Sequence, residues 1–180
     1  MNYDSTRISV LSAGMAALTS IGAYLIIPIG PVPIVLQNLF VLLTGLLLPP
    51  ASAAGTMFLY LVLGAIGIPV FAGGTGGIAH FFGPTGGYLL SYLPAATIIS
   101  LIASRKHEGL RVVLALLTGA GCIYLVGITW LILLSGMSLG QSLSVGLLPF
   151  LPGDLVKIAA AYFIGKSLKP QIHRFIARVE

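Results

Sequence analysis

Charged residues are scarce in this 180-residue sequence: Asp, Glu, Lys and Arg make up 7% of it, whereas 57% is hydrophobic. Ordinary soluble domains carry about a quarter charged residues. The chain therefore has too little polar surface for a water-soluble fold of this size. A helix that crosses a bilayer needs roughly 20 apolar residues, so membrane spans can use up nearly the whole length. We expect a single membrane domain over residues 1–180.

Cysteine and catalytic motifs are also lacking. The single cysteine, Cys122, excludes an intrachain disulfide and a thiolate metal cluster, and its apolar surroundings in sequence predict helix packing. There is no G-x-x-x-x-G-K-[ST] phosphate loop, no G-x-S-G followed by a histidine and no H-E-x-x-H. We predict no enzyme activity, no catalytic or metal-binding residues and no cofactor. The net charge of +5 is scattered over segment ends, so we expect no nucleic-acid binding.

Long apolar runs, separated by proline, glycine and charged residues, predict an all-α membrane protein with six transmembrane helices. The second and sixth runs are short for a full crossing, and Pro94 interrupts the fourth, so tilted and unequal helices are expected. The expected spans are 8–27, 33–48, 51–68, 86–103, 111–134 and 153–168.

The basic residues predict the orientation. Of the nine Lys and Arg residues, all except Lys157 fall on one side of a six-span arrangement: Arg7, Arg105, Lys106, Arg111, Lys166, Lys169, Arg174 and Arg178. The loops on the opposite side, near Gly30, at 67–85 and at 135–148, contain neither Lys nor Arg. By the positive-inside rule the basic side is cytoplasmic, and with six spans both termini lie there.

Residues 169–180 form a basic tail after the last span, with Ile172, Phe175, Ile176 and Val179 at helical spacing. An amphipathic segment of this kind would lie on the anionic lipid headgroups of the cytoplasmic leaflet. A frayed basic tail is the alternative.

Asp154 and Lys157 are the permanently ionisable residues expected at membrane depth. Each costs roughly 2.5 to 3.5 kcal/mol at the bilayer centre, so a functional role is the first hypothesis. Their spacing of three puts both on one helix face, where they can pair with one another or contact two ends of a polar ligand. A structural ion pair near the membrane interface is the alternative.

The segment 67–87 contains eight glycines and two prolines, and it has no helical periodicity. Backbone of this kind, including Gly73 and Gly74, can bring N–H and C=O groups close to a ligand, and it is tolerated at membrane depth only where protein or a watery cavity covers it. An exposed, loosely held loop is the alternative. Nearby aromatic residues could form apolar walls: Phe71, Phe81, Phe82, Tyr88 and Tyr92.

Three further polar residues are candidates for ligand contact. Gln37 and Asn38 interrupt an apolar span and could bind a ligand or merely bridge helices. His80 in the glycine-rich segment could donate to a carboxylate or face solvent.

Ala13 and Ala17 form an A-x-x-x-A pattern in the first span. Small residues at this spacing allow another helix to approach closely, and that helix could be internal or belong to a partner subunit.

These features together resemble the BioY family, the biotin-specific substrate-binding (S) subunits of energy-coupling-factor (ECF) importers. The resemblance covers essentially the whole chain and is specific because four motifs occur in order. They are GPVPIVLQ (30–37), GIPVFAGGTGG (67–77), FGPTGGYLLSY (82–92) and LPGDLVK (151–157).

The resemblance implies a six-helix domain in the plasma membrane of a prokaryote, with an outward-facing, loop-covered vitamin pocket. It implies partners as well: a transmembrane coupling subunit that docks on the A-x-x-x-A pattern, and two cytoplasmic ATPases that bind the ATP. The binding positions carried over are the glycine-rich loop, Tyr88, Asp154 and Lys157, while the sequence around Thr75 and His80 departs from the family pattern. We expect Asp154 to accept the ureido N–H groups of biotin, and Lys157 to balance charge or meet the carboxylate.

Two other functions are compatible with parts of the sequence. The chain could be the S component for another vitamin, such as thiamine or riboflavin, with the same architecture and a different pocket. An intramembrane enzyme would need a nucleophile or metal set, which the motifs above do not supply, and His107 and His173 fall on the predicted cytoplasmic side.

Overall fold

The computed structural model describes residues 4–27, 32, 34–103 and 109–177, and most of the regular structure in them is helical. The predicted all-α class is confirmed. In chain order the elements are α1 (Ser5–Tyr24), β1 (Ile26–Ile27), β2 (Ile34–Val35), α2 (Gln37–Leu47), α3 (Pro50–Ala65), the 3-10 helix η1 (Ile78–Phe82), α4 (Gly86–Ala103), α5 (Gly109–Ser135), α6 (Leu139–Gly146) and α7 (Leu151–Ile176).

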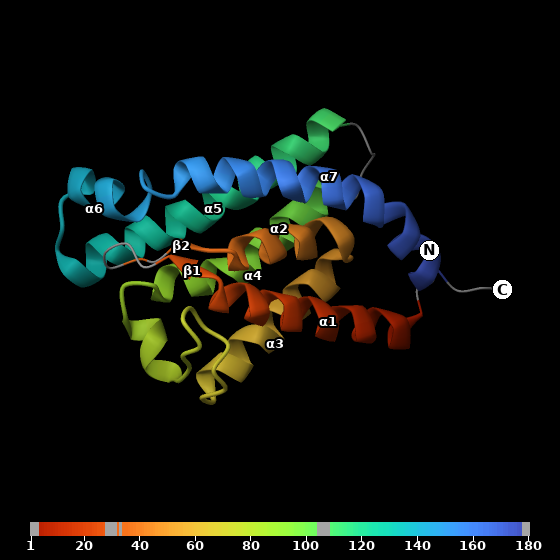
Figure 1. Cartoon of the computed structure of the whole chain (residues 1–180), viewed down its shortest axis with the longest axis horizontal. Helices are drawn as coiled ribbons and strands as arrows, with labels where there is room; N and C mark the ends of the chain where they lie inside the picture. Colours follow the sequence, from red (N-terminus) through yellow and green to blue (C-terminus); the bar gives the residue numbers. More distant parts are fainter. Residues whose placement is uncertain (1–3, 28–31, 33, 104–108, 178–180) are drawn as a thin grey trace.

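Helix α2 lies at the centre of the fold. Nine of its 11 residues are buried, and it packs against α1, α4 and α7, with α1 and α7 on opposite sides of it in Figure 1. Burial on almost every side is typical of a mostly apolar helix that is surrounded by protein. Gly45 allows α4 to come close, because a Cβ there would lie 2.7 Å from the carbonyl oxygen of Ala96 and from Ile99 Cβ.

Helix α4 runs without a break through Pro94, so the prediction that this proline interrupts the segment is wrong. Proline removes one backbone hydrogen bond of a helix, but neighbouring helices can compensate for that loss. Here α4 packs against α2, α3 and α5, and Ala95, Ala96 and Ile99 are fully buried.

The other helices follow the expected spans within a few residues, except that α7 continues from the expected end at residue 168 to Ile176. Two more differences concern the segments before α2 and after α5. The expected second span begins too early, because Ile34 and Val35 pair with Ile26 and Ile27 in a short antiparallel ladder before α2 starts. β-branched residues favour this extended conformation. The expected loop 135–148 contains α6, which begins with a capping box between Ser138 and Gln141.

Two helices of the described residues, α4 and α5, are each long and apolar enough to cross a bilayer. Helices α6 and α7 meet at 55° and would count as a third span if taken as one bent pair, while α2 and α3 are shorter apolar helices. The six-span count therefore stays a prediction.

The two ends of the described chain meet. Helix α7 continues past Pro170 to Ile176, and the backbone N–H of Asp4 donates to the carbonyl of Ile176 at 2.9 Å. Arg7 donates to the Phe175 carbonyl at 2.8 Å, and its guanidinium lies 5.4 Å from the centre of the Phe175 ring. The first part of the predicted tail is thus a continuation of α7 that packs on α1 (Figure 1).

Several residues of the sequence predictions lie outside the described residues: Gly30, Pro31 and Pro33 of the first motif, Arg105, Lys106 and His107 between α4 and α5, and Arg178 and Val179 of the tail. The cytoplasmic location of both termini stays a prediction.

Gly45→Ala should lower the free energy of unfolding by about 1–3 kcal/mol, because the added methyl group has no space between α2 and α4. The measurement is thermal or denaturant unfolding of the detergent-purified protein. Gly55→Ala is the matched control: a Cβ at this exposed position of α3 meets nothing within 4 Å. Equal stability of the two variants would contradict this description of the α2–α4 contact.

Candidate functional site

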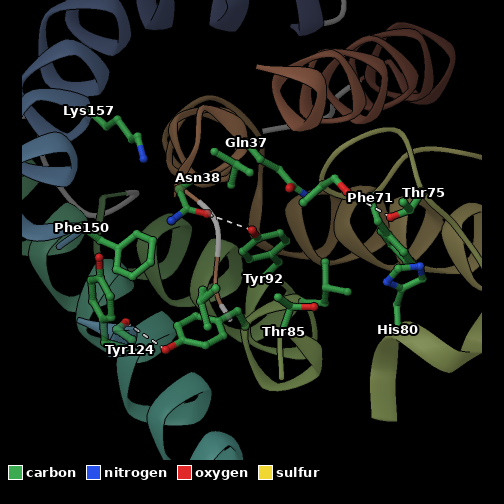
Figure 2. Close-up of a pocket in the computed structure, with 16 residues that line it drawn as sticks. Gln37, Asn38, Phe71, Thr75, His80, Thr85, Tyr92, Tyr124, Phe150 and Lys157 are labelled. Atoms are coloured by element: carbon green, nitrogen blue, oxygen red, sulfur yellow. Dashed lines mark hydrogen bonds between the residues drawn. The ribbon is translucent and has the colours of Figure 1, made fainter. Parts of the chain in front are cut away.

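A cavity of about 220 Å³ lies among the helices at the end of the molecule opposite the termini, close to the β1–β2 ladder and the glycine-rich segment (Figures 1 and 2). Its walls come from five regions of sequence that are far apart along the chain. The lining residues are Val32, Val35, Gln37, Asn38, Phe71, Ala72, Thr75, His80, Thr85, Tyr88, Leu89, Tyr92, Tyr124, Gly146, Phe150 and Lys157.

Asp154 and Lys157 form a buried ion pair in the first turns of α7. Lys157 Nζ donates to Asp154 Oδ1 at 2.7 Å, and each residue is 7% exposed. The hydroxyl of Tyr124, on α5, donates to the other carboxylate oxygen, Oδ2. Lys157 reaches the cavity, whereas Asp154 lies behind it beside a small void that Asn38 and Tyr124 also line. The structure therefore brings the predicted pair together, and the pair is neutral as a whole.

Gln37 and Asn38 bridge helices and line the cavity at the same time. Gln37 Nε2 donates to the hydroxyl of Tyr60 on α3, which in turn donates to the Val70 carbonyl at 2.9 Å. The Tyr92 hydroxyl on α4 donates to Asn38 Oδ1 at 2.8 Å. In Figure 2 the amide nitrogen of Asn38 points away from Tyr92, which leaves its two N–H donors for another partner.

Tyr88 and Phe71 are fixed by glycines on neighbouring helices. The Tyr88 hydroxyl donates to the carbonyl of Gly146 at 2.9 Å, and its ring occupies the space that a side chain at Gly127 would need. The Phe71 ring lies in the same way against Gly64 of α3. Both rings line the cavity, so the small residues facing them determine where its apolar walls stand.

The other predicted aromatic walls have different locations. The ring of Phe81 packs edge-on against Phe71, at 5.6 Å between ring centres, and is not among the lining residues. Phe82 is 68% exposed. Tyr92 does line the cavity.

Gly73 and Gly74 form the turn of the glycine-rich loop. Their φ angles are 75° and 71°, a region that side-chain-bearing residues rarely adopt. The N–H of Gly73 donates to the Ala23 carbonyl at 2.9 Å and that of Gly74 to the Phe71 carbonyl at 3.0 Å. These glycines are not lining residues: they turn the chain so that Phe71, on one side, and Thr75, on the other, face the cavity. Direct ligand contact by the two glycines stays a prediction.

His80 and Lys157 lie on opposite sides of the cavity (Figure 2). His80 belongs to η1, and its ring is edge-on to Phe71 with 5.7 Å between ring centres. Thr85 lies between η1 and α4 and also lines the cavity. The cavity thus has one polar end at the ion pair and another at the loop, with aromatic rings between them.

Sequence reasoning missed Tyr124, which connects α5 to the ion pair. A signal was present, because tyrosines in membrane helices usually lie at the interface, whereas Tyr124 stands in the middle of a long apolar run. Phe150 and Gly146 had no comparable signal, since their place depends on how α6 and α7 meet. In the described part of the chain, no three His, Cys, Asp or Glu side chains cluster closely enough to hold a metal ion.

Apolar helices around a small cavity, with paired charges at one end and a loop at the other, define a membrane protein that holds a solute. The sequence profile of the BioY family matches residues 1–174. The chain belongs to the BioY family.

Named relatives agree with this assignment. The "Probable biotin transporter BioY" of Pyrococcus horikoshii is 44% identical over 159 residues, which cover 88% of this chain and 94% of that protein. The "Biotin transporter BioY" of Thermotoga maritima is 36% identical over 161 residues, covering 89% and 95%. The crystal structure of the S-component for biotin from an ECF-type ABC transporter superposes with a TM-score of 0.86 at 33% identity and covers 96% of both chains. These proteins are transport components, and the chain is not an enzyme.

Lys157→Met should lower the free energy of unfolding by about 3–5 kcal/mol, because it leaves the Asp154 carboxylate buried without its cation. The double variant Asp154→Asn/Lys157→Met removes both charges and should recover much of that loss. The free energy of unfolding of the wild type, Lys157→Met and the double variant is measured by denaturant titration in detergent. A double variant that is as unstable as Lys157→Met would contradict a stabilising role for charge neutrality here.

Proposed function

We propose that this chain binds biotin and is the substrate-specific S subunit of an ATP-driven vitamin importer. The observation that carries the proposal is the cavity among the helices, with Lys157 of the Asp154–Lys157 pair at one end and aromatic residues in its walls. It is supported by the biotin transporters and the biotin S-component to which the chain is similar. A cavity of about 220 Å³ suits a small ligand, since it is somewhat smaller than the pockets of roughly 300–1,000 Å³ that hold drug-sized ligands.

The chemistry of the two polar ends gives the ligand an orientation. A ureido group is neutral and needs both donors and acceptors, and at this end of the cavity the Asn38 amide and the Lys157 ammonium line the wall, with the Asp154 carboxylate directly behind Lys157. Because Asp154 already neutralises Lys157, this end is better suited to a neutral group than to a second carboxylate. We therefore assign the ureido ring to the ion pair and the ligand carboxylate to the loop end, near the imidazole of His80 and the hydroxyl of Thr85.

The apolar rings of the ligand would lie between these ends. Tyr92 lies between Lys157 and His80 in Figure 2, Phe71 lines the cavity beside His80, and Tyr88 also lines it; Gln37 holds the neighbouring Tyr60 by a hydrogen bond. In this arrangement Gly73 and Gly74 act by shaping the loop that covers the bound vitamin.

The chain is a membrane protein, and we propose that it crosses the plasma membrane of a prokaryote six times as a single domain. The predicted spans at 8–27, 33–48, 51–68, 86–103, 111–134 and 153–168 each overlap a helix of the fold. The excess of Lys and Arg at the terminal end supports a cytoplasmic location of both termini, which puts the cavity and its loop on the outer side.

The solved S-component for biotin that the chain resembles comes from an ECF-type ABC transporter, and an S subunit of this kind would need energising partners. We propose a complex with a transmembrane coupling subunit and two cytoplasmic ATPases. Ala13 and Ala17 are exposed on α1, whereas Met15, Ala16 and Thr19 on its other side are buried. The A-x-x-x-A surface is therefore free of other helices in the described part of the chain and is available to a helix of the coupling subunit.

Biotin should bind to the detergent-purified chain, and thiamine and riboflavin should not, in an equilibrium titration.

Gly127→Ala should weaken biotin binding by about tenfold, because the added methyl group displaces the Tyr88 ring from the cavity wall.

Gly121→Ala is the matched control on the same helix. A Cβ at this position has no neighbour within 4 Å, so this variant should bind biotin as the wild type does. Binding of thiamine or riboflavin in place of biotin would assign the pocket to another vitamin. Equal biotin affinity of Gly127→Ala and Gly121→Ala would remove Tyr88 from the binding site.

Ala17→Trp should leave biotin binding unchanged and lower biotin uptake by about tenfold or more, because a large side chain prevents close helix contact with the coupling subunit. Uptake is measured in proteoliposomes that contain the energising subunits and ATP. Leu125→Trp, at a position that is 71% exposed on α5, is the control and should transport normally. Normal uptake by Ala17→Trp would place the docking surface elsewhere.

A further inference from the structure

A second cavity, of about 370 Å³, lies at the opposite end of α7 from the candidate biotin site. In Figure 1 this is the end of α7 nearer the two termini. The cavity lies between the last turns of α2, the first turns of α5 and the second half of α7. Its lining residues are Leu46, Gly109, Val112, Tyr162, Gly165, Lys166, Lys169 and Pro170.

The polar groups of this cavity come from one face of α7. Tyr162, Lys166 and Lys169 follow one another at spacings of four and three, which brings a hydroxyl and two ammonium groups to the same side of the helix. None of the described lining residues is acidic. Lys169 donates to the Ala103 carbonyl at 3.1 Å, whereas Lys166 forms no ion pair with any described residue. The cavity therefore carries positive charge that these neighbours do not neutralise.

The other walls of the cavity are apolar. Leu46, Val112 and Pro170 supply hydrocarbon surface beside the two lysines. Large apolar side chains of α5 and α7 are exposed close by in the sequence: Leu110 on α5 is 73% exposed and Phe163 on α7 is 69% exposed. A ligand with an anionic group and a hydrocarbon chain matches this combination, and a free hydrophilic anion would match only half of it.

We infer that this cavity binds the phosphate-bearing headgroup of an anionic phospholipid, with its acyl chains along the outer surfaces of α5 and α7. Basic pockets between helices on the cytoplasmic side of a membrane are suited to such headgroups. The inference rests on the proposed membrane orientation, which puts Lys166 and Lys169 at the cytoplasmic leaflet. It does not depend on biotin, because no residue lines both cavities.

The test is native mass spectrometry of the detergent-purified full chain, titrated with dioleoylphosphatidylglycerol, with dioleoylphosphatidylcholine, and with inorganic phosphate. The wild type should retain phosphatidylglycerol in preference to phosphatidylcholine. Lys166→Gln should lower phosphatidylglycerol affinity by about fivefold, the factor that one lysine contributes near an anionic headgroup. Arg174→Gln is the matched control: it is an exposed residue of α7, carries the same charge and does not line the cavity.

Equal phosphatidylglycerol affinity of Lys166→Gln and Arg174→Gln would overturn the proposal. Competition of inorganic phosphate with phosphatidylglycerol at similar concentrations would also overturn it, because the cavity would then bind a soluble phosphate. Biotin affinity is measured on the same samples and should be unchanged in Lys166→Gln. A chain that binds the lipid but not biotin would refute the proposed function and leave the lipid site standing.

Discussion

The ion pair between Asp154 and Lys157 is the interaction on which the site depends. Two opposite charges among apolar helices are tolerable only when they lie close together and when neighbouring groups satisfy their remaining hydrogen bonds. Tyr124 meets part of this need by donating to the free carboxylate oxygen. Because the pair spans the first turns of α7 and Tyr124 belongs to α5, the electrostatic requirement also fixes how these two helices approach one another.

The shape of the cavity depends on small residues as much as on the residues that line it. Gly127 and Gly64 leave space for the rings of Tyr88 and Phe71, and the positive φ angles of Gly73 and Gly74 turn the loop so that Phe71 and Thr75 line the cavity. Apolar walls, fixed by close packing, then separate a polar end at the ion pair from a polar end at His80. A pocket built in this way is largely preformed, which reduces the conformational cost of binding.

Much of the fold could be read from the sequence because hydropathy is a local property. The apolar runs predicted most helix bounds within a few residues, and Asp154 and Lys157 stood out as charges in an apolar segment. The errors have physical causes: packing on three sides carries α4 through Pro94, and the pairing of Ile26 with Val35 delays the start of α2. The capping box of α6 is visible in the sequence, but the helix that follows it has only eight residues, too few for a clear periodicity.

The sequence alone determined the class of protein, the family, the positions of most helices and the two charges that define the site, because composition, periodicity and motif order do not depend on packing. Only the tertiary structure decided which side chains meet. Tyr92 reaches Asn38, Tyr124 reaches Asp154, and Leu46 closes a cavity with Lys166, although each pair is separated by at least one helix or by tens of residues. Such contacts follow from the angles and distances between packed helices, and no local pattern in the chain encodes them.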